Sequence, residues 1–140
     1  VNALMTAFRA GNRDYISSVA ELLHEEFTYT VSESTELTGD SLRRASILHA
    51  LYCLSLGMLR LMSGESIAIN PVELLRVAVN DGDLSYITQS LIAASALLIK
   101  GDSSWLGDFR DLVQGISDGL IKDMFLAFLD IAGLIKSPDP

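Results

Sequence analysis

Three long segments of the chain are hydrophobic around most of a helix rather than along one side of it. Residues 45–59 and 84–99 carry no formal charge, and residues 124–134 contain a single acid, Asp130. A helix that is apolar on all sides has to be covered on several of them. We therefore expect these segments to be central packing helices, to contact another subunit, or to seek a membrane.

Residues that begin and end helices divide the whole chain into short units. Apolar spacing, the Asn70-Pro71 start signal and stops such as Gly11 and Gly82 predict seven helices with short connections. With their caps, these helices are expected at residues 1–10, 14–27, 41–62, 70–80, 83–100, 102–114 and 117–136. The sequence thus predicts an all-α fold, a single domain over residues 1–140 in which the helices at 41–62, 83–100 and 117–136 form the interior of a compact bundle.

Two short stretches are expected to be extended instead of helical. Thr28–Val31 is rich in β-branched and aromatic residues, which are poor helix formers. Ser66–Ile69 lies between two predicted helices and contains two isoleucines. We expect these stretches to pair as a very small two-stranded ribbon.

A weak internal sequence similarity relates the two halves of the chain. Six residues, Val1, Leu4, Ala7, Gly11, Tyr15 and Ile16, recur at a constant offset as Val72, Leu75, Ala78, Gly82, Tyr86 and Ile87. One interpretation is a two-fold repeat with residues 1–64 and 70–137 as its halves. The other is that helix-turn-helix units share residue types for physical reasons.

The acidic residues are concentrated in one part of the chain. The formal net charge is −8, and residues 14–40 contain acids but no lysine or arginine. Nucleic-acid binding needs clustered basic residues, so we expect no direct contact with nucleic acid. The expected acidic face consists of Glu21, Glu25, Glu26, Glu33 and Glu36. It is either a contact for a basic or amphipathic partner or an ordinary solvated surface.

Cysteine content and the amino-terminal residues bear on the compartment. Cys53 is the single cysteine, and residues 1–10 show neither a basic start nor an apolar run typical of a secretory signal. No uncharged stretch reaches the roughly 18–20 residues that a membrane span requires. These features predict an intracellular, cytoplasmic protein without a membrane span.

Catalytic and metal-binding patterns are sparse. Glu21 and His24 have the spacing of one half of a di-iron motif, but no second copy exists. His49 and Cys53 lie four residues apart, which would allow a thiolate–imidazole pair on one helix face. Their strongly apolar helix instead favours a buried cysteine and a hydrogen-bonded histidine. We predict no catalytic residue, no cofactor and no metal site.

Two groups of aromatic residues are candidates for recognition. Trp105, Leu106 and Phe109 lie in the first turn of a predicted helix beside an acidic loop, and tryptophan is frequent among interface anchors. Phe27, Tyr29 and Val31 lie within the acidic run, where they would form an apolar ridge with a negative rim, and Phe27 and Tyr29 are its candidate contact residues. The alternative in both cases is that the side chains close the hydrophobic core.

Gly57 and Gly133 lie inside two of the long apolar helices. Glycine there costs about 1 kcal/mol relative to alanine, which a close helix crossing would offset, either within the fold or across a dimer. Together with the apolar surface to be covered, this predicts a non-enzymatic protein-interaction or assembly module, at least dimeric, that binds a basic or amphipathic segment. The alternatives are a helical domain that encloses a hydrophobic small molecule and a domain that inserts into membranes.

Overall fold

The computed structural model describes residues 1–33, 37–66, 70–117 and 119–136, and within these ranges every regular element is a helix. The helices are α1 (Asn2–Arg9), α2 (Arg13–Glu33), α3 (Gly39–Met62), α4 (Pro71–Asp81), α5 (Leu84–Ile99), α6 (Leu106–Gln114) and α7 (Leu120–Lys136). The predicted all-α bundle of seven helices with long apolar central members is confirmed for the described residues.

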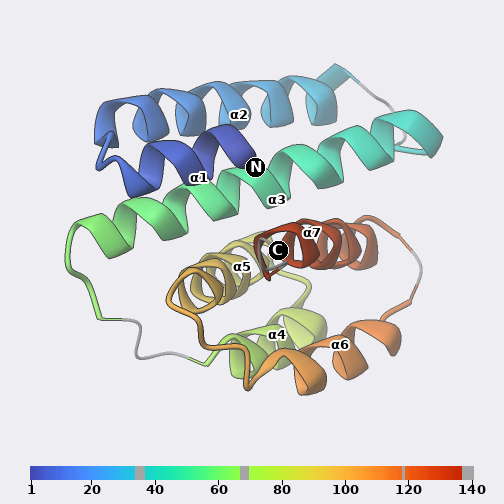
Figure 1. Cartoon of the computed structure of the whole chain (residues 1–140). Helices are drawn as coiled ribbons and strands as arrows, with labels where there is room; N and C mark the ends of the chain where they lie inside the picture. Colours follow the sequence, from blue (N-terminus) through green and yellow to red (C-terminus); the bar gives the residue numbers. More distant parts are fainter. Residues whose placement is uncertain (34–36, 67–69, 118, 137–140) are drawn as a thin grey trace.

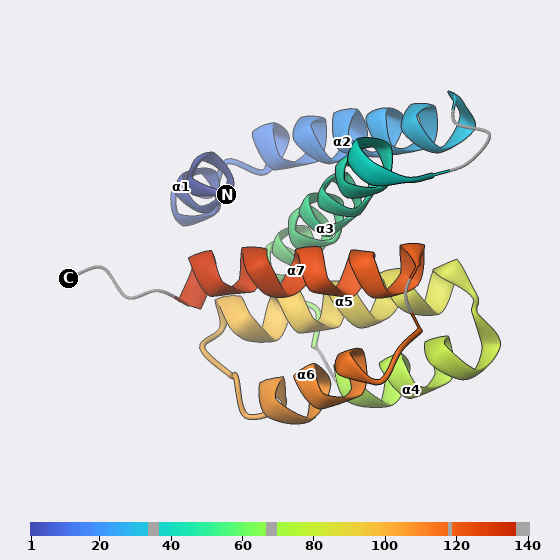
Figure 2. The same cartoon turned by 90° about the vertical axis from the view of Figure 1, so that its right-hand side faces the viewer.

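The helices are stacked in layers, with α3 near the middle (Figures 1 and 2). On one side α3 packs against α2, which also carries α1. On the other side α3 packs across α5 and α7, and the opposite faces of α5 and α7 are covered by α4 and α6. α3, α5 and α7 are therefore each in contact with helices on at least two sides, as their composition requires.

The predicted start and stop signals around α4 and α5 take the expected conformations. The Asn70 side chain accepts a hydrogen bond from a backbone N–H of the first turn of α4 at 2.8 Å. Gly82 ends this helix in the left-handed conformation, with φ 67°. Asp83 then caps α5 through a backbone N–H at 2.9 Å. The predicted cap at residues 117–118 lies partly outside the described residues, and α7 begins at Leu120.

The prediction that Thr28–Val31 is extended is wrong, because α2 continues through these residues to Glu33. Inside the helix, the Thr30 hydroxyl donates to the Glu26 carbonyl at 2.7 Å, and the Thr30 side chain is buried. Helix propensity is a weak preference that tertiary packing overrides. Without an extended Thr28–Val31 the predicted ribbon cannot form, and the other half of it, residues 67–69, lies outside the described residues.

The crossing of α3 and α5 depends on Gly57. A Cβ atom at this position would lie 2.9 Å from Ser95 Cβ and 3.1 Å from backbone atoms of Ile92 and Ala96. The absence of a side chain therefore lets the two helices approach closely, as the sequence predicted. Gly133 differs, since nothing lies within 4 Å of its would-be Cβ among the described residues. A close crossing at Gly133 within the fold is not observed.

Residues matched by the internal sequence similarity have similar local roles. Gly11 and Gly82 both take the left-handed conformation, with φ values of 70° and 67°. Ile16 and Ile87, which follow these turns, are both almost completely buried. The two helix-turn-helix units, α1–α2 and α4–α5, are thus locally alike, while a repeat of the complete halves stays a prediction.

Candidate interaction surfaces

The aromatic residues at the start of α6 lie in the core rather than on the surface. Trp105 and Leu106 are 5% and 6% exposed, and Phe109 is fully buried. The Phe109 ring contacts Trp105 edge-on, with centroids 5.3 Å apart, and also packs on Phe125 and Phe128 of α7. Of the two alternatives for Trp105, Leu106 and Phe109, their positions favour closure of the core over contact with a partner.

Hydrogen bonds also fix the loop that precedes α6. The Trp105 indole N–H donates to the Asp102 carbonyl at 2.8 Å. The Ser104 hydroxyl and backbone N–H both donate to the Asp102 carboxylate, which holds the pKa of this carboxyl below its usual value. Asp102 thus caps the turn, as predicted, and the acidic loop positions the tryptophan inward.

The outward side of α2 carries a line of large exposed side chains. Tyr15, Leu22 and Tyr29 are 41%, 61% and 62% exposed. They lie seven residues apart, which is nearly two helical turns, so they project from one narrow sector of the helix. We call these three residues the α2 stripe. Of the three ridge residues that the sequence predicted, the structure brings Tyr29 to the surface, and Val31, outside the α2 stripe, is 36% exposed.

Phe27 lies on the other side of the same helix. It is half-buried, and its ring lies against the imidazole of His49 on α3, with centroids 5.4 Å apart. In the expected extended segment, Phe27 and Tyr29 would share a face, because strand side chains alternate. In a helix, residues two apart point in widely different directions. The predicted pairing of Phe27 with Tyr29 in one ridge is therefore wrong.

The acidic face follows the α2 stripe. Glu21, Glu25, Glu26 and Glu33 are all exposed on α2, whereas Glu36 lies outside the described residues. Glu26 forms an ion pair with Arg44 of α3 at 3.0 Å, and the other three pair with no described residue. Glu26 and Glu33 each follow a stripe residue by four positions, which makes them its neighbours on the helix surface.

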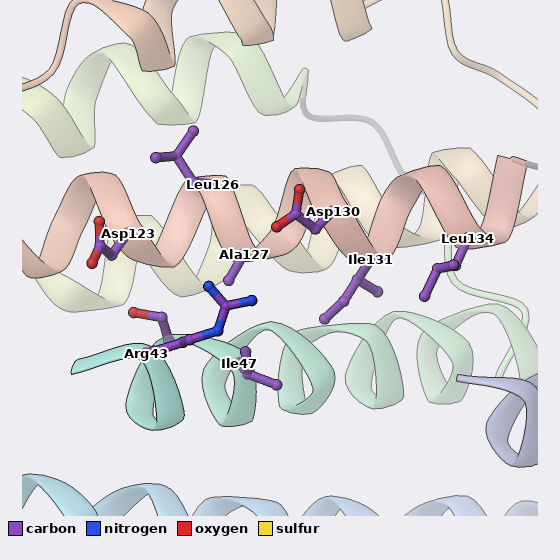
Figure 3. Close-up of a pocket in the computed structure, with 9 residues that line it drawn as sticks. Arg43, Ile47, Asp123, Leu126, Ala127, Asp130, Ile131 and Leu134 are labelled. Atoms are coloured by element: carbon purple, nitrogen blue, oxygen red, sulfur yellow. The ribbon is translucent and has the colours of Figure 1, made fainter. Parts of the chain in front are cut away.

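A second surface, a groove between α3 and α7, was not predicted from the sequence (Figure 3). Its volume is about 360 Å³, and it is open to solvent. The hydrophobic residues that line it are Ile47, Leu126, Ala127, Ile131 and Leu134. Leu134, near the end of α7, is 64% exposed.

Three charged residues border this groove. Asp123 and Asp130 come from α7, and Arg43 comes from α3. Figure 3 shows the Arg43 guanidinium reaching toward α7 between the two carboxylates. In the described part of the chain, Arg43 lies within 4.0 Å of neither and forms no ion pair. A signal was present, since Asp123 and Asp130 are seven residues apart and are the two acids of α7, but Arg43 is at least eighty positions away.

A second hollow, of about 310 Å³, lies between α2, α3 and α5. Its walls include His24 and Tyr52, whose rings lie 5.1 Å apart, and His49. His49 Nε2 lies 3.0 Å from the Thr88 hydroxyl oxygen. This hollow is also open to solvent rather than enclosed.

The His49–Cys53 pair does not provide an activated thiol. The sulfur lies 3.8 Å from His49 Nε2 and 3.9 Å from Nδ1, and both residues are buried. Burial lowers the pKa of His49 to about 4 and raises the pKa of the Cys53 thiol. At neutral pH both groups are therefore uncharged, the reverse of a thiolate–imidazolium pair.

Two further features concern metals and membranes. No group of three or more histidine, cysteine or acidic residues that could hold a metal ion occurs among the residues that the structure describes. Within the same residues, α3 is the one helix long and apolar enough to cross a membrane by length and composition. Half of its most apolar window is buried inside the bundle, as expected for a central helix.

Comparison with known proteins finds no match: no family model fits the chain, and no curated protein or solved structure is significantly similar to it. The arguments about function therefore rest on the two surfaces themselves.

Proposed function

We propose that this chain is a protein-interaction module whose α2 helix binds a basic amphipathic helix of a partner protein. The observation that carries the proposal is the α2 stripe, three large side chains in line on an exposed helix face, beside glutamates of which Glu25 and Glu33 pair with no described residue. Binding of this kind depends on apolar side chains at helical spacing and on charged residues at the edges of the contact.

The hydrophobic part of the proposed contact comes from Tyr15, Leu22 and Tyr29. Burial of apolar surface stabilises a complex by about 25 cal/mol per Å² removed from water. Tyrosine is enriched among residues that dominate binding energy, because a rigid ring and a hydroxyl meet both apolar and polar partners. A partner helix with leucine or isoleucine at heptad spacing would pack along this line.

The electrostatic part comes from the acidic face. Glu25 and Glu33 have no ion-pair partner among the described residues, and the whole chain carries a formal charge of −8. Lysine or arginine at the edges of the partner helix would meet these carboxylates. Such charges accelerate association and exclude acidic partners more than they add affinity, and salt screens them.

Two synthetic helices with the same leucine heptads test the proposal, one flanked by lysine and arginine and the other by glutamate. Fluorescence anisotropy with the full chain should show binding of the basic helix, weaker at high salt, and little binding of the acidic one. Leu22→Ala should weaken binding of the basic helix roughly tenfold, the scale of a hot-spot residue.

Leu84→Ala is the matched control. Leu84 is 46% exposed but lies at the start of α5, outside the α2 stripe, and truncation of its side chain should leave the affinity unchanged. Equal binding of the acidic and basic helices would contradict the proposal, and so would equal effects of the two leucine variants.

A further inference from the structure

The groove between α3 and α7 has a hydrophobic floor and two borders of opposite charge. The α7 border carries Asp123 and Asp130, and the α3 border carries Arg43. A surface that contains both signs of charge can be complementary to itself, which is the requirement for a contact between identical chains related by a two-fold axis. The α2 face lacks this property, because α2 contains acidic residues along its length and a single arginine, Arg13, at its start.

We propose that this groove is the interface between two copies of the chain, with α7 of each copy lying in the groove of the other. Two-fold symmetry then brings Arg43 of each copy to the Asp123 and Asp130 border of its partner. Each guanidinium, which has no ion-pair partner among the described residues, gains carboxylates in a partly desolvated position. This inference does not depend on the proposed function of α2.

The floor of the groove supplies the hydrophobic contribution. Leu134 is 64% exposed, and its burial in an interface removes apolar surface from water and stabilises the complex. In a two-fold dimer Leu134 of each copy is buried, so this contribution occurs twice. Ala127 has a small side chain, and no described residue lies within 4 Å of the position that a Cβ of Gly133 would take. A second α7 can therefore approach closely along this side of the helix.

Charge selects a second copy over other occupants of the groove. A uniformly basic helix would be attracted by Asp123 and Asp130 but repelled by Arg43, and an uncharged small molecule would leave all three groups unpaired. Two chains of charge −8 do repel each other. At physiological ionic strength this repulsion is largely screened beyond about 8 Å, whereas the contacts in the groove are shorter.

Sedimentation-velocity experiments over a micromolar to millimolar concentration series test the association. The unmodified chain should convert from monomer to dimer as concentration rises. Leu134→Ser, at an exposed position where the fold tolerates polarity, should raise the dimer dissociation constant roughly tenfold. A chain that stays monomeric throughout the series overturns the inference, as does a dimer that Leu134→Ser leaves unchanged.

A charge exchange identifies the interface. Arg43→Asp makes both borders acidic, and the double variant Asp123→Arg with Asp130→Arg makes both basic, so each protein alone should be monomeric. Mixed together, they should form a heterodimer, which native mass spectrometry resolves by mass. Circular dichroism checks that each variant is folded, and Arg110→Asp on α6 controls for the change in net charge.

The mixture decides between the groove and any other contact. Recovery of association in the mixture alone supports the two-fold arrangement, because only complementary borders explain it. Continued dimerisation of either variant by itself overturns it, and so does a mixture of folded variants that remains monomeric. Leu22→Ala on α2 should leave dimerisation unchanged, which separates this interface from the proposed partner site.

Discussion

α6 and α2 both present aromatic residues near acidic segments, yet the structure uses them in opposite ways. Trp105 is buried against Phe109, which packs on α7, whereas Tyr15, Leu22 and Tyr29 of α2 face solvent. Residue type does not separate the two cases. The number of apolar stripes on each helix does.

α6 has a single apolar stripe. Its buried residues Leu106, Phe109 and Val113 follow the three- and four-residue spacing of one helix face, and that face packs into the core. α2 has a buried face that includes Ile16 and Ala20, and the α2 stripe lies outside it. α2 is an outer helix that packs on α1 and α3, so its second stripe stays exposed and is the better candidate for contact with another protein.

The largest expected effect contrasts Trp105 with Tyr29. Trp105→Ala removes a buried ring and its hydrogen bond to the Asp102 carbonyl, and should lower the free energy of unfolding by about 3–5 kcal/mol. Tyr29→Ala should change it by less than about 0.5 kcal/mol, as is usual on the surface. Urea denaturation followed by circular dichroism measures both. A small change in unfolding free energy for Trp105→Ala would indicate that Trp105 is exposed, and it would contradict the contrast with Tyr29.

The two histidines offer a similar contrast under acidic conditions. Burial lowers the pKa of His49 from 6.5 to about 4 in the folded chain. Between these values the unfolded chain binds a proton that the folded chain does not, so stability falls as pH drops from about 6.5 toward 4. The loss from this residue should be roughly 3 kcal/mol.

His49→Gln should flatten this part of the stability curve, because glutamine cannot take up the proton but can still hydrogen-bond to Thr88. His24→Gln, at an exposed position on α2, serves as the control for the same substitution outside the core. The measurement is the difference in unfolding free energy between variant and unmodified chain at each pH. Parallel curves for His49→Gln and the unmodified chain would mean that His49 takes up its proton equally in the folded and the unfolded chain, so that burial does not lower its pKa.

The same contrast explains how far the sequence could predict the structure. Patterns within one helix were sufficient for the helix count and for the Asn70 and Asp83 caps, because these depend on neighbours along the chain. Thr28–Val31 was mispredicted because packing against α3 outweighs local propensity. The groove could not be foreseen, since it requires the relative placement of Arg43 and Asp130, which are distant in sequence.

Gly57 and Gly133 provide a third comparison between a buried and an exposed position, with a smaller expected change in stability. Gly57→Ala places a methyl group 2.9 Å from Ser95 Cβ and should destabilise the fold by about 1–3 kcal/mol, as overpacking does. Gly133→Ala meets no described residue within 4 Å and should stabilise the monomer by up to about 1 kcal/mol through helix propensity. Thermal unfolding at low concentration measures both. Equal effects would mean that α3 and α5 do not cross at Gly57.

The smallest expected effect concerns the ion pair between Glu26 and Arg44. Both side chains are more than half exposed, at 54% and 60%, so Arg44→Gln should change stability by less than about 0.5 kcal/mol. Its effect on binding is more informative. Arg44 competes with a basic partner for the Glu26 carboxylate, and its removal should increase the affinity of the basic synthetic helix by about twofold. Glu26→Gln should decrease that affinity and make it less sensitive to salt. If Arg44→Gln weakened binding instead, the partner would contact Arg44 directly, and the acidic face could not be what selects it.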